Sequence, residues 1–112
     1  MITTEALKEL GCNTEEGLSR CLNNEAFYLR LVPAALEETR YRSLDEKIGA
    51  GDLKGAFEDA HSLKGVLANL SLTPLYEVVS QIAELLRAET DTDYRPLLDK
   101  MWDVKGKFDE LI

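Results

Sequence analysis

The side chain best suited to chemistry at neutral pH is His61, the chain's one histidine. Neutral imidazole is a good nucleophile and forms covalent intermediates in group-transfer reactions. His61 lies in the run AHSLKG over residues 60–65, so a lysine follows it by three positions and a glycine by four. Lys64 can place positive charge near an anionic group on the ring, and Gly65 leaves the helix surface bare beside it. This spacing indicates a nucleophile with a nearby cation and clear space for a partner.

Each of these residues also has an ordinary explanation. A lone histidine on a helix is usually a surface residue, a glycine can serve helix packing, and a lysine is usually solvated. A glycine inside a helix costs about 1 kcal/mol relative to alanine, so Gly65 needs a reason of one kind or the other. The residue types alone leave both interpretations open.

Other kinds of site find little support in the sequence. Cys12 and Cys21 are nine positions apart without histidine neighbours, which fits no metal signature, and we expect inert buried thiols. Glycine-rich phosphate loops are absent from the sequence. The acidic pairs at 15–16 and 37–38 are adjacent in the chain and are typical of solvated helix faces. We therefore expect neither a metal nor a cofactor of the chain's own.

The elements that must position His61 are helices, because apolar residues recur at helical spacing along the chain. Asp52 is the expected N-cap of the longest helix, and Thr73 that of the next, with Pro74 in its first position. Pro33 is expected to kink its helix or to mark a junction. The predicted helices cover residues 4–10, 14–22, a segment from Asn24 carrying Phe27, Leu31, Ala34, Ala35 and Leu36, then 40–49, 53–71, 73 to 87 or 89, and 94–111.

The helical period also gives the direction of His61. An apolar stripe on the longest helix must face the bundle, and His61 lies about 100° from its centre. His61 is therefore expected on the flank of the helix, and Lys64 between that flank and the core. The stripe consists of Leu53, Ala56, Phe57, Ala60, Leu63, Leu67 and Leu70, and the flank is shared by Lys54, Glu58, Gly65 and Ala68.

Length and charge limit the class of protein. The 112 residues suit a single helical domain over 1–112, in which 45% apolar residues build a core without disulfides or a structural metal. A formal net charge of −8 without a basic run disfavours nucleic acid and anionic membranes. Neither a signal peptide nor an apolar segment of membrane-spanning length is present in the sequence, so we expect a cytoplasmic protein. A monomer is expected, since a bundle buries its own apolar faces.

The segment around His61 resembles the signature of histidine phosphotransfer (Hpt) domains. The matching residues are His61 to Gly65 and then Asn69-Leu70. The similarity extends to residues 51–60 before the motif and 75–86 after it. The start of the chain, with Leu10-Gly11, Glu15-Glu16 and Leu18, resembles small stand-alone bacterial members.

The resemblance implies an antiparallel four-helix bundle with additional short N-terminal helices. It implies a phosphocarrier without a nucleotide site, not an enzyme, with His61 as phosphoacceptor and Lys64 and Gly65 as its neighbours. The implied partners are response-regulator receiver domains, which supply Mg²⁺ and an acidic pocket, and a hybrid histidine kinase. We expect Lys54, Glu58 and Ala68 to contribute to docking.

Two positions depart from the family pattern. Ser71 follows Leu70 where a glycine is common. On the next helix, Ala83 aligns with a position that is often Glu or Gln, and Glu84 points about 100° away from it.

Two further interpretations belong to other classes of protein. One is a non-phosphorylated adaptor that docks a receiver or kinase, although an adaptor has no need of His61, Lys64 and Gly65 together. The other is a structural bundle with an incidental histidine, or one that uses His61 as a cofactor ligand. A ligand histidine is expected to point into the bundle and not to lie on its flank.

Overall fold

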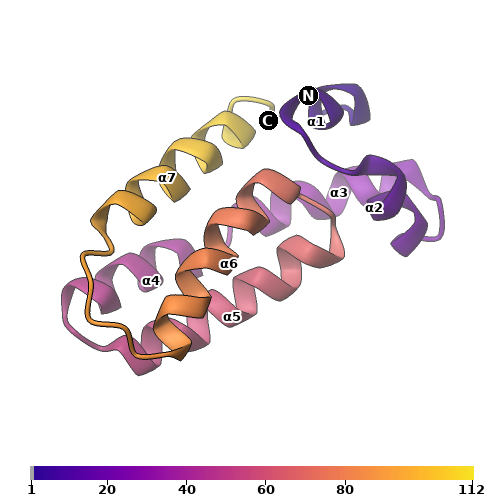
Figure 1. The fold of residues 1–112 in the computed structure, drawn as a ribbon. Helices are drawn as coiled ribbons and strands as arrows, with labels where there is room; N and C mark the ends of the chain where they lie inside the picture. The colour runs from indigo at the N-terminus through magenta and orange to yellow at the C-terminus, as the bar shows by residue number, and fades with distance from the viewer. Residues whose placement is uncertain (1) are drawn as a thin grey trace.

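The computed structural model describes residues 2–112, and every regular element in that range is an α-helix (Figure 1). Each helix begins within one residue of its predicted start, which confirms the all-α fold. The helices are α1 (Thr4–Leu10), α2 (Thr14–Arg20), α3 (Glu25–Leu36), α4 (Arg40–Gly49), α5 (Leu53–Asn69), α6 (Thr73–Arg87) and α7 (Arg95–Asp109).

Helices α4 to α7 form the four-helix bundle. Helix α5 packs between α4 and α6, and α7 packs against α6. Side chains of α4 and α7 close the bundle, since the rings of Tyr41 and Trp102 lie 6.5 Å apart. The connections at 50–52 and 70–72 are short, which makes neighbouring helices antiparallel. Helices α1 to α3 extend the molecule beyond one end of this bundle (Figure 1), to overall dimensions of 41 × 24 × 20 Å.

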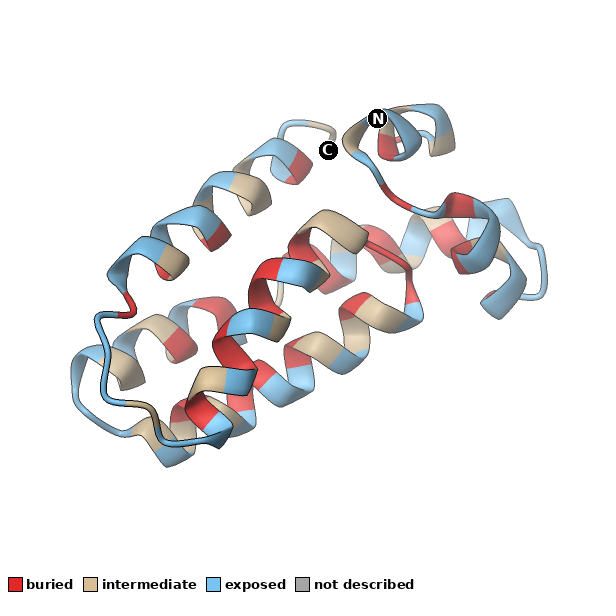
Figure 2. Ribbon diagram, in the orientation of Figure 1, coloured by how far each residue is buried: buried red, intermediate tan, exposed pale blue. Residues whose placement is uncertain are grey.

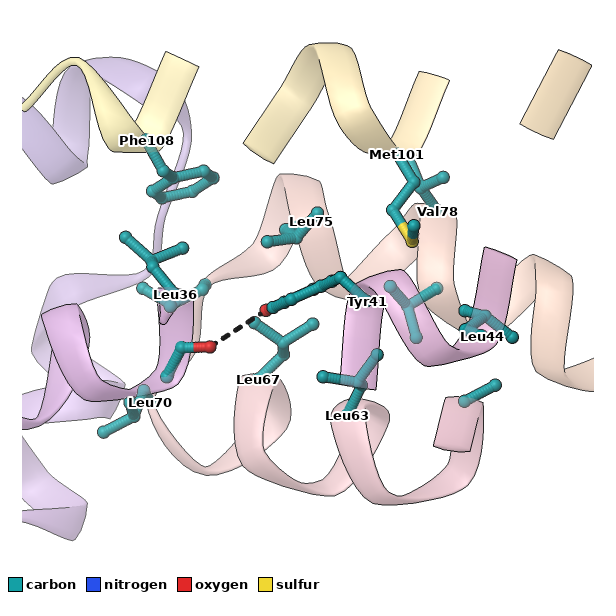
Figure 3. Packing of buried hydrophobic residues seen from close by; sticks show 14 of the residues in the cluster. Leu36, Tyr41, Leu44, Leu63, Leu67, Leu70, Leu75, Val78, Met101 and Phe108 are labelled. Atoms are coloured by element: carbon teal, nitrogen blue, oxygen red, sulfur yellow. Dashed lines mark hydrogen bonds between the residues drawn. The ribbon is translucent and has the colours of Figure 1, made fainter. Parts of the chain in front are cut away.

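The core of the bundle is mostly apolar, and the buried tyrosine hydroxyls in it are hydrogen-bonded. Tyr41 is buried, and its hydroxyl donates a hydrogen bond of 3.1 Å to the carbonyl of Ala35 (Figure 3). A buried hydroxyl with a partner avoids the cost of desolvation. The largest fully buried side chains are those of Tyr28, Tyr41, Phe108, Leu7, Leu36, Leu44, Leu63, Leu67, Leu72, Leu75, Ile82 and Leu86.

Helix α3 differs from the prediction in the face that it buries. Phe27 and Ala34, placed on the expected apolar stripe, are exposed, whereas Tyr28 and Val32 are buried. The prediction was wrong for Phe27 and Ala34, whereas Ala35 and Leu36 of the same stripe are buried and Leu31 is half-buried. Tyr28 lay outside the predicted stripe, and its burial is possible because its hydroxyl finds a partner inside the protein. The helix continues through Pro33 and ends three residues later, so the junction with α4 falls at residues 37–39.

The two helices on either side of the 70–72 connection are capped differently. Asp52 caps α5 as predicted, since its carboxylate accepts a hydrogen bond of 2.9 Å from the Gly55 amide. The predicted Thr73 cap of α6 is wrong by one residue, because Thr73 is already helical and Leu72 is the N-cap. The Thr73 hydroxyl instead donates to the carbonyl of Ser71, which has a φ of 54°.

Helices α2 and α3 cap the C-terminal end of α5. Arg20 donates hydrogen bonds to the Ala68 carbonyl and, at 3.0 Å, to the Ser71 hydroxyl. The Tyr28 hydroxyl donates to the Leu70 carbonyl at 2.9 Å. The last carbonyls of a helix lack partners within it, so these contacts stabilise the end of α5. They also fix the N-terminal helices on the bundle.

Two further predictions concern the cysteines and membrane-spanning segments. Cys12 and Cys21 are both buried, as expected, and both are free thiols. Within residues 2–112, the helices are too short or too polar to cross a membrane.

Candidate functional site

His61 lies in the middle of α5 and is exposed. The same helix turns Ala56, Ala60, Leu63 and Leu67 inward, where each is fully buried. Figure 2 shows this division along α5, with one face buried and the outer face exposed. The predicted direction of His61, on the flank of the helix, agrees with this arrangement.

The rotation of α5 about its axis is held by a buried carboxylate. Asp59 is 9% exposed, and its Oδ2 accepts a hydrogen bond of 2.6 Å from Ser43 and pairs with Lys47 at 3.1 Å. Residues two apart on a helix point about 200° from each other. Anchoring Asp59 against α4 therefore directs His61 away from α4, toward solvent on the side of α6.

Phe57 positions the imidazole from one turn earlier in α5. The rings of Phe57 and His61 stack with centroids 5.7 Å apart and planes 25° apart. Phe57 is half-buried and packs against the core. Helical side chains lean toward the N-terminus, so the His61 ring lies over Phe57 and its opposite side faces Gly65. The apolar periodicity of α5 predicted only a core position for Phe57. The signal for its second role is its spacing of four residues before His61.

Gly65 leaves that opposite side open. A Cβ added at Gly65 would meet nothing within 4 Å, so packing inside the molecule does not require a glycine here. Gly17 shows the contrast, because a Cβ there would lie 2.7 Å from the Leu70 carbonyl oxygen. Contacts with residues 2–112 therefore do not explain why a glycine stands at position 65. What the glycine provides is clear space beside His61.

Lys64 takes part in a small group of charges between α5 and α6. Its ammonium lies 3.9 Å from Oε1 of Glu84, and Arg87 binds both carboxylate oxygens of Glu84, at 2.7 and 2.5 Å. Hydrogen bonding by Arg87 is the main cause that holds the pKa of Glu84 below its ordinary value. The carboxylate is therefore ionised at neutral pH. Arg87 was not predicted as part of this site, because the register between two helices brings it to this group.

The remaining predicted residues lie along the same flank. Lys54 and Glu58 are exposed, and Ala68 is half-buried beside Arg20 of α2. Ala83, which aligned with the family's Glu or Gln position, is 2% exposed and belongs to the core. Among residues 2–112, none donates or accepts a side-chain hydrogen bond to the His61 ring.

Two hollows on the surface lie away from His61. A hollow of about 390 Å³ lies near the connection between α6 and α7, and one of about 660 Å³ lies where α2 meets the end of α5. Neither is lined by His61. Across residues 2–112, no group of three or more His, Cys, Asp or Glu side chains is arranged to hold a metal ion. His61 is exposed and lies outside both hollows, so a group bound to its ring would face solvent.

Comparison with protein families identifies the class. Residues 34–112 match the Hpt domain, which covers the end of α3 and all of α4 to α7. The chain therefore belongs to the Hpt domain family. Comparisons with curated proteins and with solved structures give no match.

Family membership gives the general role. Hpt domains take part in phosphotransfer within phosphorelays, where they interact with receiver domains and kinases. They are phosphocarriers and not enzymes. The helical bundle is the fold that the resemblance implied.

Proposed function

We propose that this protein accepts a phosphoryl group on His61 from an aspartyl phosphate of one receiver domain and donates it to another. The observation that carries the proposal is the exposed imidazole with open space at Gly65, where nothing lies within 4 Å of an added Cβ. A bare surface of this kind allows the active site of a second protein to close over the ring.

The transfer balances in both directions. A ring nitrogen of neutral His61 forms a bond to phosphorus while the bond from phosphorus to the aspartyl oxygen breaks. The aspartate recovers its carboxylate, and the phosphorylated ring releases a proton. The second receiver reverses these events with its own aspartate. The transferring phosphoryl group carries spread negative charge, which Mg²⁺ in the receiver and the ammonium of Lys64 would both stabilise.

The docking surface in this proposal is the flank of α5. Lys54 and Glu58 lie on it before His61, and Ala68 lies beyond Gly65. Because Gly65 and Ala68 have small side chains, little protrudes from this end of the flank. A cytoplasmic location and a monomeric state are parts of the same proposal.

Intact-mass measurement tests the proposal directly. The protein is incubated with a panel of phosphorylated receivers, and the wild type is compared with His61→Gln and with Ser62→Ala. An acid-labile phosphoryl adduct on wild type and Ser62→Ala, but absent from His61→Gln, is the expected result. Ser62 is the matched control because it is an exposed neighbouring nucleophile.

Other outcomes point to the other classes of protein. Binding to a receiver without an adduct would contradict phosphotransfer and favour an adaptor. An adduct that survives acid or persists in His61→Gln would assign the modification to another residue. If no receiver in the panel binds the protein or forms an adduct with it, the interpretation as a structural bundle is favoured.

A further inference from the structure

Within residues 2–112, Glu84 is the one carboxylate that pairs both with Lys64, a cation close to His61 in α5, and with a second cation, Arg87. Lys64 approaches it from α5, and Arg87 approaches it from the next turn of α6. The two contacts are unequal. Arg87 holds both carboxylate oxygens, at 2.7 and 2.5 Å, whereas Lys64 lies 3.9 Å away, at the outer limit of an ion pair.

Because the two contacts are unequal, Lys64 can move away without leaving the Glu84 carboxylate unpaired. If the ammonium swings away, Glu84 stays hydrogen-bonded to Arg87 through both oxygens. The exposed pair between Lys64 and Glu84 is weak, since both ends are partly solvated. Lys64 lies three residues after His61, a spacing at which helical side chains are neighbours. The flexible lysine therefore has two anionic partners within reach once the ring carries a phosphoryl group.

We infer that Glu84 is a positioning residue that holds Lys64 while His61 is free and releases it to the phosphoryl group on phosphohistidine. This inference rests on the proposed function of His61. A phosphoryl group carries more negative charge than a carboxylate, so it competes well for the ammonium. Arg87 is essential to the exchange, because it keeps Glu84 neutralised after Lys64 has moved.

Two substitutions should shift the phosphorylation of His61 in opposite directions. Glu84→Gln removes the competitor for Lys64 and a nearby negative charge, so it should favour the phosphorylated state. Arg87→Gln leaves Glu84 with Lys64 as its cation, so it should disfavour that state. A structural role for the cluster would instead give losses in both variants.

The experiment measures phosphoryl exchange with phosphoimidazole in the presence of free imidazole. A bond from phosphorus to nitrogen breaks in the donor and an equivalent bond forms on His61, so the equilibrium constant reports the protein environment. The fraction of phosphorylated chain is read by intact mass. The full chain is compared with Glu84→Gln, Arg87→Gln, Lys64→Gln and the Lys64→Gln/Glu84→Gln double variant, after circular dichroism has verified folding.

Glu77→Gln is the matched control. Glu77 is an exposed carboxylate on α6, two turns before Glu84, and forms no ion pair with any of residues 2–112. It carries the same change of charge on the same helix. Its exchange constant should equal that of the wild type.

The expected result is a rise of roughly two- to fivefold in the exchange constant for Glu84→Gln, in line with an exposed ion pair. Arg87→Gln should lower the constant, and the effect of Glu84→Gln should largely vanish when Lys64 is already Gln. An unchanged constant in Glu84→Gln, or an equal rise without Lys64, would overturn the inference while leaving phosphorylation of His61 intact. Failure of the wild type to accept phosphoryl from any donor would overturn both proposals.

Discussion

The imidazole of His61 stacks on the phenyl ring of Phe57, one turn earlier in α5, with 25° between the ring planes. An exposed histidine would otherwise sample several rotamers, and holding it in one lowers the entropic cost of reaching a receiver's phosphoryl group. Phe57 has its own support, because it packs against the core. Phe57 thus orients the His61 ring from its N-terminal side, while the side of the ring toward Gly65 stays open.

Phe57→Leu should slow phosphoryl transfer by up to about tenfold, since a contact between aromatic rings contributes about 0.5–1.5 kcal/mol. Phe57→Tyr keeps the ring and should transfer at close to the wild-type rate. Single-turnover transfer from a phosphorylated receiver measures both, alongside thermal unfolding. Equal rates in the wild type and Phe57→Leu would show that stacking does not orient His61.

Substitution of Gly65 should separate stability from transfer. Gly65→Ala should stabilise the protein by about 1 kcal/mol, because alanine favours helix and its Cβ meets nothing within 4 Å. Gly65→Leu should remain folded and yet block receiver docking, so that transfer falls sharply. Urea unfolding and single-turnover transfer give the two quantities.

Gly106→Ala is the control for that pair. Gly106 is also inside a helix, α7, and its Cβ would likewise meet nothing within 4 Å. This variant should gain similar stability and transfer at the wild-type rate. Wild-type transfer by Gly65→Leu would contradict the role given to the open space at Gly65.

The sequence predicted features that depend on local rules. The Asp52 cap and the recurrence of small and apolar residues set the start of α5, and the helical period placed His61 on its flank. Phe57 lay at the edge of the apolar stripe, where periodicity does not separate a core residue from a half-buried one. The cap of α6 was misplaced by one residue because the Thr73 hydroxyl donates to the carbonyl of Ser71 and caps no amide of α6, so the helix begins without a side-chain cap.

Features that depend on the register of distant segments were not predictable. The contact of Lys64 with Glu84 requires the 70–72 connection to align α5 and α6 in one way. Arg20 reaches the end of α5 from 48 residues away in the chain. Neither relationship has a local signature, and both are fixed only by the packed fold.

Cys12 should be unreactive in the native protein. Burial raises the pKa of its thiol to about 11, which leaves little thiolate at pH 8. Iodoacetamide at pH 8 should therefore leave Cys12 unmodified in the folded chain and alkylate both cysteines in urea, as read by intact mass and peptide mapping. Rapid alkylation of Cys12 without denaturant would show that α1 and α2 open readily from the bundle.

Asp45 should make the stability of the bundle depend on acid pH. Both terminal nitrogens of Arg95 bind its carboxylate at 3.0 Å, and Trp102 donates to it at 2.6 Å. Hydrogen bonding by Arg95 is the main cause that lowers the pKa of Asp45. A lowered folded-state pKa adds stability above the ordinary value, near pH 4, and this contribution is lost as the pH falls through the folded value.

Asp45→Asn should accordingly lower Tm by a few degrees at pH 7, because it removes the charge that joins α4 to α7. The difference from the wild type should shrink as the pH falls below the ordinary value near 4, because the unfolded chain then binds a proton at Asp45 that the folded carboxylate does not yet bind. Thermal unfolding across pH 3–7 measures this, and Asp103→Asn, an exposed carboxylate with a single contact of 3.7 Å to Lys107, is the control. If the difference in Tm between wild type and Asp45→Asn stayed constant from pH 7 to pH 3, the change of side-chain shape and not the lost charge would explain the lower Tm.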